Sequence, residues 1–267
     1  MENVLKNIVD KKKEKISNLK KILPVNNILN NIKEIDNFIN FKKKIIDRSS
    51  KKEISIIAEI KKASPSAGIL VENFDPLSIA KLYVKNGASF LSVLTEENYF
   101  LGKLDNIRNI KNNFQIPVLC KDFFIDTYQV ALAKSYGSDC ILIILSAVDK
   151  LLAKDLYQAA NDLNISTLIE VHSENEAEIA LSFEDSIIGI NNRNLKTLEV
   201  SLNTTVNLSK ILNSHKFPLV CESGIHSRKE IDFIIENTNI YNFLIGESLL
   251  KSNDIQSKLR EFTRITL

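Results

Sequence analysis

From residue 54 onward, short apolar runs alternate with stretches that have the 3.6-residue spacing of amphipathic helices. The runs predict eight strands, at residues 54–60, 89–94, 117–121, 140–145, 167–171, 187–191, 218–223 and 242–246. The stretches between and after them predict helices at residues 76–86, 104–113, 126–135, 149–163, 173–182, 203–213, 227–237 and 253–265. Several of these helices open with favourable N-cap residues: Asp75, Asp126, Asp149 and Ser227.

The predicted strands are continuously apolar rather than alternating, which is typical of parallel strands covered on both faces. Regular alternation of strand and helix implies right-handed βαβ units. Eight such units predict an α/β protein with a (β/α)8 TIM barrel. A doubly wound open sheet is the alternative. The turn after the first strand, residues 64–68 (SPSAG), lacks the GxGxxG pattern of such sheets.

Residues 1–50 do not follow this repeat. Apolar residues between Leu5 and Leu23 have helical spacing, and a second amphipathic pattern runs from Ile28 to Ile46. We therefore expect an N-terminal helical extension, residues 1–50, packed on a single barrel domain, residues 51–267. The lysines at positions 11–13 are expected to form a solvated helix face.

Composition narrows the class of protein. Lys and Arg number 35 and Asp and Glu 33, a net charge of +2, so no nucleic-acid partner is expected. The three cysteines lie in apolar runs without CxxC spacing, which predicts buried, reduced thiols in a cytoplasmic protein. No signal peptide or membrane span is expected. The three histidines, His172, His215 and His226, lack metal-ligand spacing and are expected in loop or surface roles.

Charged residues occur at the carboxyl ends of the predicted strands. Because residues two apart in a strand point to the same side, Glu59 and Lys61 should project together. Alternate strands of a barrel contribute to one layer, which should also contain Lys121, Glu170 and Glu222. From the sixth strand, Asn191 and Arg193 should join this layer. Three cations and three carboxylates at one mouth favour a catalytic site. A purely structural network of ion pairs is the alternative.

A phosphate site is predicted beside this layer. Gly224 and Gly246 end the last two strands, where barrel enzymes often bind phosphate through backbone N–H groups. Two ordinary glycine turns are the alternative interpretation. Glu247, directly after Gly246, argues against an anion site unless its carboxylate points away.

Seven segments in order resemble the motifs of the indole-3-glycerol phosphate synthase family: IAEIKKASPSAG, SVLTEENYF, PVLCKDFFID, LIEVHSENE, IGINNRNLKT, VCESGI and FLIGESLL. The resemblance covers about residues 50–250. It implies a (β/α)8 enzyme of tryptophan biosynthesis that needs no cofactor or metal. It also implies a phosphorylated small-molecule substrate, whose indole ring the enzyme closes with loss of carbon dioxide and water. A monofunctional form is expected, acting as a monomer or a weak dimer.

The resemblance also implies roles for individual residues. Catalytic roles carry over to Glu59, Lys61, Lys121, Glu170, Asn191 and Glu222. Substrate binding carries over to Ser64, Phe100, Phe123, Arg193 and Ser223, and phosphate binding to Ser64, Gly224, Gly246 and Ser248. Lys121 resembles the general acid of ring closure, and Lys61 resembles the partner of the substrate carboxylate. Phe100 and Phe123 are equally consistent with a plain core.

The chain departs from the usual family pattern at Ala67, Cys120 and Asn194, where lysine, arginine and aspartate are common. None of these is a catalytic position. Three other interpretations remain open at this point. The chain is compatible with a Schiff-base aldolase that uses Lys121 as nucleophile, with an isomerase of a phosphoribosyl anthranilate compound, and with an inactive barrel that serves as a binding scaffold.

Overall fold

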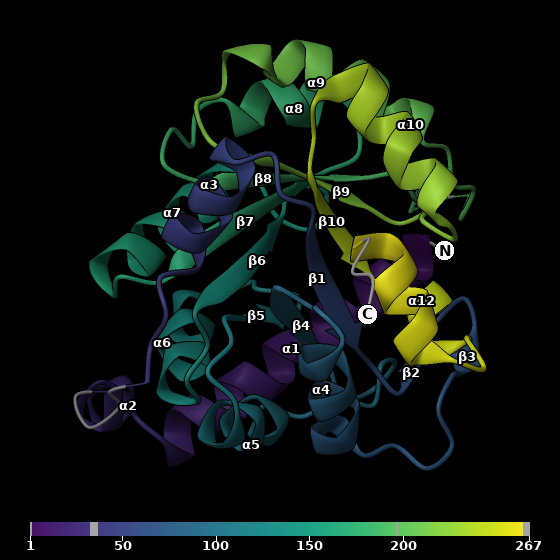
Figure 1. Cartoon of the computed structure of the whole chain (residues 1–267). Coiled ribbons are helices and arrows are strands. Elements are labelled where there is room, and N and C mark those ends of the chain that lie inside the picture. Colours follow the sequence, from purple (N-terminus) through teal and green to yellow (C-terminus); the bar gives the residue numbers. More distant parts are fainter. Residues whose placement is uncertain (1, 33–36, 196, 264–267) are drawn as a thin grey trace.

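The computed structural model describes residues 2–32, 37–195 and 197–263. Eight parallel strands close into a barrel in the order β1-β10-β9-β8-β7-β6-β5-β4. They are β1 (Ser55–Ile60), β4 (Phe90–Leu94), β5 (Val118–Lys121), β6 (Cys140–Ile144), β7 (Ser166–Val171), β8 (Ile187–Asn191), β9 (Leu219–Glu222) and β10 (Asn242–Ile245). Helices form the outer layer around them (Figure 1). The predicted (β/α)8 barrel is therefore confirmed.

Each predicted barrel helix is present. They are α4 (Pro76–Lys85), α5 (Asp105–Asn113), α6 (Thr127–Ser135), α7 (Lys150–Asp162), α8 (Glu174–Ala180), α9 (Asn203–Ile211), α10 (Arg228–Thr238) and α12 (Ile255–Thr263). The carboxylates of Asp75, Asp126 and Asp149 accept backbone N–H groups of the following first turns, and Ser227 forms a capping box with Glu230. These caps satisfy N–H groups that a helix leaves free, which explains why each helix begins where it does.

Three helices precede the barrel: α1 (Glu2–Ile22), α2 (Val25–Ile32) and α3 (Phe41–Ser50). The second N-terminal pattern is thus divided between two helices. Residues 33–36 of that pattern, residue 196 of the IGINNRNLKT segment and residues 264–265 of the last expected helix lie outside the described residues. None of the helices in the described ranges is long and apolar enough to cross a membrane.

The apolar core has an inner and an outer part. The inner part fills the barrel with side chains such as Ile57, Leu119 and Leu168, and the outer part packs the strands against the surrounding helices. Helix α3 closes the amino end of the barrel, because its Phe41 packs on Phe90 with ring centroids 4.5 Å apart. The extension therefore contributes directly to the barrel interior.

Short elements that the sequence did not predict follow two strands and one helix. The loop after β1 contains an antiparallel hairpin of β2 (Ala63–Ser64) and β3 (Gly68–Ile69). A 3-10 turn, η1 (Leu212–Ser214), follows α9, and the four-residue helix α11 (Glu247–Leu250) follows β10. The hairpin and α11 lie at the carboxyl end of the barrel and border its mouth.

Candidate active site

The barrel brings ionisable side chains from four separate strands to one end. Glu59 lies near the end of β1, Lys121 ends β5, Glu170 lies near the end of β7 and Glu222 ends β9. Parallel strands in a closed barrel point their carboxyl ends to the same mouth. Segments more than a hundred residues apart therefore meet there.

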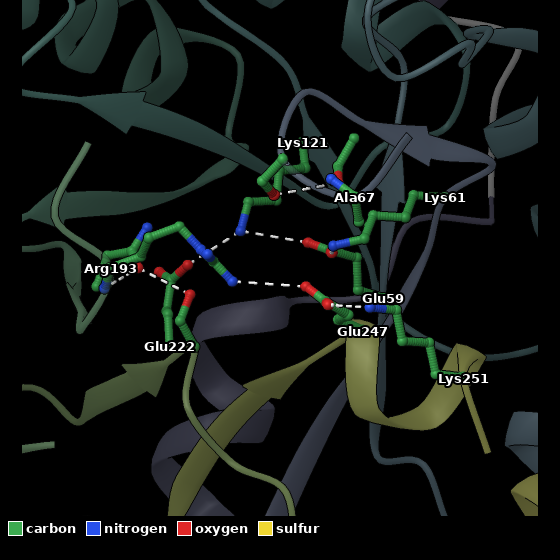
Figure 2. A network of polar contacts seen from close by, with 12 residues as sticks. Glu59, Lys61, Ala67, Lys121, Arg193, Glu222, Glu247 and Lys251 are labelled. Carbon is green, nitrogen blue, oxygen red and sulfur yellow. Dashed lines mark hydrogen bonds and ion pairs between the residues drawn. The ribbon is translucent and has the colours of Figure 1, made fainter. Parts of the chain in front are cut away.

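Lys121 lies at the centre of this cluster. Its Nζ is 3.0 Å from Glu222 Oε2, 3.3 Å from Glu59 Oε2 and 3.9 Å from Glu170 Oε2. Figure 2 shows the lysine between Glu59 and Glu222. The Lys121 side chain is 17% exposed and the three carboxylates are more deeply buried. A single ammonium is thus shared among three acidic groups.

Lys61 extends the cluster on the β1 side. Its Nζ donates to Glu59 Oε1 over 2.6 Å, as the strand alternation of these two residues predicts. Burial would raise the pKa of Glu59, but Lys61 and Lys121 outweigh it and lower that pKa to about 2. Glu59 is therefore ionised throughout the neutral range.

Burial and charge act in opposite directions on the other members. Burial alone would lower the pKa of Lys121, but Glu222, Glu59 and Glu170 together raise it above the ordinary value. Burial raises the pKa of Glu222 to about 8, and the charge of Glu170 adds to this effect against the attraction of Lys121. At neutral pH the lysine is therefore an ammonium, and Glu222 is the carboxyl group that holds a proton most readily.

A second set of contacts orients these groups from β8 and the loop after β9. Asn191 donates through Nδ2 to Glu170 Oε1 over 3.2 Å. Its Oδ1 accepts from Ser223 Oγ over 2.9 Å and from the backbone N–H of Arg193 over 3.0 Å. Ser223 has a left-handed backbone, with φ of 65°, which is uncommon for a residue with a side chain.

Arg193 pairs with Glu247 rather than with the central carboxylates. Its Nη2 is 3.5 Å from Glu247 Oε2, and Lys251 Nζ is 2.6 Å from the other oxygen of Glu247 (Figure 2). Glu247 lines the same cavity as the charged cluster, so its carboxylate does not point away from the site. Its charge is shared between two cations, which reduces the repulsion that it would exert on an anion.

A cavity of about 240 Å³ opens beside the charged cluster. Every site residue predicted from the sequence contributes to its lining except Glu222, which borders it through Lys121. Phe100 and Phe123 form one wall, with ring centroids 6.3 Å apart. The cavity thus has a charged floor and an aromatic side, which suits an aromatic ligand with acidic groups.

The four residues predicted to bind phosphate also line the cavity. The hydroxyls of the two serines among them already have hydrogen-bond partners within the protein. Ser64 Oγ accepts from the backbone N–H of Ala67 over 3.1 Å, and Ser248 Oγ donates to the carbonyl of Ile225 over 2.7 Å. Gly224 is left-handed, with φ of 84°. A Cβ at Gly246 would overlap Glu59 Oε1, so this glycine also makes room for a carboxylate of the cluster.

The N-terminal helix also forms part of the site, which the sequence did not predict. Val4, Leu5 and Ile8 of α1 line the cavity. Lys12 on the same helix is 7% exposed, and its Nζ lies 2.6 Å from Oδ1 of Asp122, the residue after Lys121. The prediction that all three lysines at positions 11–13 form a solvated face is therefore wrong for Lys12. Its spacing of four from the buried Ile8 was the signal that this position faces the barrel.

His172 is a second residue whose position the sequence left unresolved. It follows β7 in a loop, as expected, but its side chain is only 9% exposed. Its Nε2 lies 3.1 Å from Glu170 Oε1, so a surface role is excluded. The spacing of two residues from Glu170 was the available signal. Within the described ranges, no group of three or more His, Cys, Asp or Glu side chains is arranged to hold a metal ion.

Comparison with known proteins places this site in a family. The family model for indole-3-glycerol phosphate synthase matches residues 5–262. An indole-3-glycerol phosphate synthase of Bordetella pertussis is 38% identical over 254 residues, which cover 95% of this chain and 96% of the relative. One of Thermoanaerobacter pseudethanolicus is 41% identical over 262 residues, which cover 98% of this chain and 97% of the relative.

Solved structures agree on the architecture. The 3-hexulose-6-phosphate synthase of Salmonella typhimurium matches with a TM-score of 0.64 and 12% identity, covering 79% of this chain and 97% of that one. At this identity the likeness concerns the barrel fold alone. The family model and the curated relatives, by contrast, match nearly the whole chain, including every strand that contributes to the charged cluster. The chain therefore belongs to the indole-3-glycerol phosphate synthase family.

Proposed function

We propose that this chain is an indole-3-glycerol phosphate synthase. It converts 1-(2-carboxyphenylamino)-1-deoxyribulose 5-phosphate to indole-3-glycerol phosphate, carbon dioxide and water, in tryptophan biosynthesis. The observation that carries this proposal is the Lys121 ammonium, held among three carboxylates on the floor of a cavity with an aromatic wall. Family membership supports the same assignment.

The cavity offers complementary groups for each part of this substrate. We assign the phosphate to the loops at Gly224, Gly246 and Ser248, together with Ser64. The substrate carboxylate is assigned to Lys61 and Arg193, two cations that line the cavity. Phe100 and Phe123 are assigned to the aromatic ring, which leaves the ribulose carbons above Lys121. These assignments follow the chemistry of the lining residues.

Ring closure requires an acid next to the ketone. The aromatic carbon that bears the carboxylate attacks the ketone carbon, a carbon–carbon bond forms, and the carbonyl oxygen takes a proton. Lys121 is assigned as the donor, because its three acidic neighbours keep it protonated. The carboxylate then leaves as carbon dioxide, and the electron pair of the broken bond restores one ring double bond.

Dehydration completes the indole. A base removes a proton from the intermediate and an acid protonates the departing hydroxyl, so that water leaves and the ring becomes aromatic. Glu170 is assigned as the base and Lys61 as the acid. Asn191 and Ser223 keep Glu170 in place through the hydrogen bonds described above. Glu59 and Glu222 hold the two lysines in position.

The Schiff-base alternative is disfavoured by the charge environment of Lys121. A nucleophilic amine must be neutral, and three carboxylates within 3.9 Å favour the ammonium instead. Borohydride with substrate would trap a covalent lysine adduct in an aldolase, and we expect none here. Turnover in the experiment below would also exclude an inactive scaffold.

The decisive experiment measures turnover of the carboxyphenylamino-deoxyribulose phosphate with EDTA present, by the fluorescence of the indole product. We expect full activity, because the proposed chemistry uses only side chains. If no indole product formed at high enzyme concentration, the proposed function would be wrong. Activity that EDTA abolished would instead reject the metal-free mechanism.

We also propose that the enzyme works as a cytoplasmic monomer. Three cysteines, all free and buried, suit a reducing compartment. Sedimentation at assay concentrations would test the monomer, and a stable dimer would contradict it.

A further inference from the structure

An imidazole outside the proposed catalytic set lies between two carboxylates. His172 follows β7 by one residue, and its Nε2 is 3.1 Å from Glu170 Oε1. Its other ring nitrogen, Nδ1, is 3.2 Å from Oε2 of Glu176, in the first turn of α8. The backbone N–H of His172 donates to the same Glu176 oxygen over 2.7 Å. Both sides of the ring are therefore occupied by acceptors.

This geometry identifies the charge state of the ring. A neutral imidazole carries one N–H and one lone pair, so it satisfies one carboxylate and repels the other. Only the imidazolium carries a proton on each side and a positive charge between the two carboxylates, with Nδ1 hydrogen-bonded to Glu176 and Nε2 meeting Glu170 as an ion pair without hydrogen-bond geometry. The charged groups that act on the ring are Glu170 from β7 and Glu176 from α8, and together they raise the pKa of His172 to about 10 against the effect of burial.

The contacts divide the two oxygens of Glu170 between different tasks. Oε1 faces both His172 Nε2 and Asn191 Nδ2, the latter at 3.2 Å. Oε2 is buried, has no hydrogen-bond partner among the described residues, and lies 3.9 Å from Lys121 Nζ. Oε1 is therefore held by the hydrogen bond from Asn191 and by the ion pair with His172, whereas Oε2 is directed to the centre of the site.

We propose that His172, held as an imidazolium by Glu176, is a positioning residue that anchors Oε1 of Glu170 and leaves Oε2 as the proton acceptor of the synthase reaction. This inference rests on the proposed function. Burial works against ionisation of Glu170, but contacts with His172 and Lys121 lower its pKa to about 2, so its carboxylate is unprotonated at neutral pH. Glu176 of α8 thus holds His172, and His172 in turn holds Glu170.

Steady-state kinetics of His172→Ala test the role directly, with each rate expressed relative to the wild type. We expect kcat to fall roughly 10- to 100-fold, with KM within about 2-fold, because an orienting group is lost and a binding group is not. The acid limb of the kcat/KM profile should move to higher pH, since Glu170 loses a neighbouring positive charge. Added imidazole should restore part of kcat.

Two further variants separate this role from general damage. His215→Ala removes another half-buried histidine, whose Nε2 lies 2.8 Å from the carbonyl of Ser186, and should keep wild-type kcat. Glu176→Gln removes the outer carboxylate and should lower the pH at which His172 titrates. Unchanged kcat in His172→Ala, or a loss accompanied by an unshifted pH profile and no rescue by imidazole, would overturn the proposal.

A spectroscopic measurement keeps the inference independent of the activity. Nitrogen-15 NMR of the histidine ring, assigned by comparison with His172→Ala, should show both nitrogens of His172 protonated at pH 8. Titration near 6.5, the ordinary value, would reject the imidazolium even in an active enzyme. Conversely, a protonated ring in a protein that does not form indole would leave the ring contacts intact and reject only the proposed function.

Discussion

Gly189 in β8 lies directly against the carboxylate of Glu222 in β9. A Cβ at position 189 would overlap Glu222 Oε1, and its next nearest neighbours would be Glu222 Cδ at 3.2 Å and Leu168 Cδ1 at 3.4 Å. The obstacle is the end of a flexible side chain rather than backbone. The absent side chain of Gly189 is therefore what allows Glu222 to occupy its place beside Lys121.

Gly189→Ala should impair catalysis more than folding. Displacing Glu222 removes the 3.0 Å contact with Lys121, and we expect kcat to fall at least about 10-fold while the free energy of unfolding changes by less than about 1 kcal/mol. Gly102→Ala is the matched control. Its Cβ would overlap the backbone carbonyl of Leu94, so about 1–3 kcal/mol of stability should be lost instead. Steady-state kinetics and urea unfolding of both variants separate the loss of kcat from the loss of stability. Equal changes in kcat and in unfolding free energy for the two variants would contradict the prediction.

Lys121→Ala should abolish turnover, by at least about a thousand-fold, while substrate binding stays largely intact. The reason is that Lys121 is assigned as the acid of ring closure, whereas the other lining residues hold the substrate. Single-turnover fluorescence, recorded over a range of enzyme concentrations, measures both the rate of indole formation and the affinity for the substrate. Lys121→Arg keeps the positive charge among the three carboxylates but cannot release a proton at neutral pH, so it should also be inactive. Lys154→Ala, an exposed position on α7, is the control. Near-wild-type turnover in Lys121→Ala would exclude the assigned role.

Lys12→Met should loosen the helix that covers the mouth. Asp122 would lose its 2.6 Å ion pair but keep hydrogen bonds from Thr95 Oγ1 and the backbone N–H of Phe123, so we expect a loss of about 1–3 kcal/mol. KM should rise because α1 lines the cavity. Lys13→Met changes an exposed neighbour on the same helix and should do neither. Chemical denaturation measures the stability of both variants, and steady-state kinetics measures their KM. Equal stability and equal KM in Lys12→Met and Lys13→Met would contradict this account.

Glu222→Gln should gain stability relative to the wild type as pH rises. The folded protein raises the pKa of Glu222 to about 8 from 4.5, so the native state binds its proton more tightly than the unfolded chain between these values. Wild-type stability from this group is full below pH 4.5 and is lost as pH rises through 8. Glutamine resembles the protonated form and has no such loss. The unfolding free energy of Glu222→Gln minus that of the wild type should be larger at pH 8 than at pH 5, by at least about 1 kcal/mol. A pH-independent difference would refute this.

Much of the fold was readable from local pattern. Continuous apolar runs such as CILIIL, and caps such as Asp75, specify strands and helix starts through interactions within a few residues. Strand alternation likewise placed Lys61 beside Glu59, and the 2.6 Å contact agrees. The division of the chain at residue 50 stays a prediction.

The remaining features depend on which segments meet in space. The pattern of α1 predicted a helix but not that Lys12 would reach Asp122, and the spacing of His172 from Glu170 did not reveal that Glu176 of α8 would meet the other side of its ring. The balance of charges around Lys121 was equally unreadable, because it depends on distances to carboxylates from three other strands. The sequence alone determined the order of strands, helices and ionisable residues, since these follow from periodicity and local hydrogen bonding. Only closure of the barrel decided which charges became neighbours, because electrostatic interactions depend on separation in space and on burial, which no local pattern encodes.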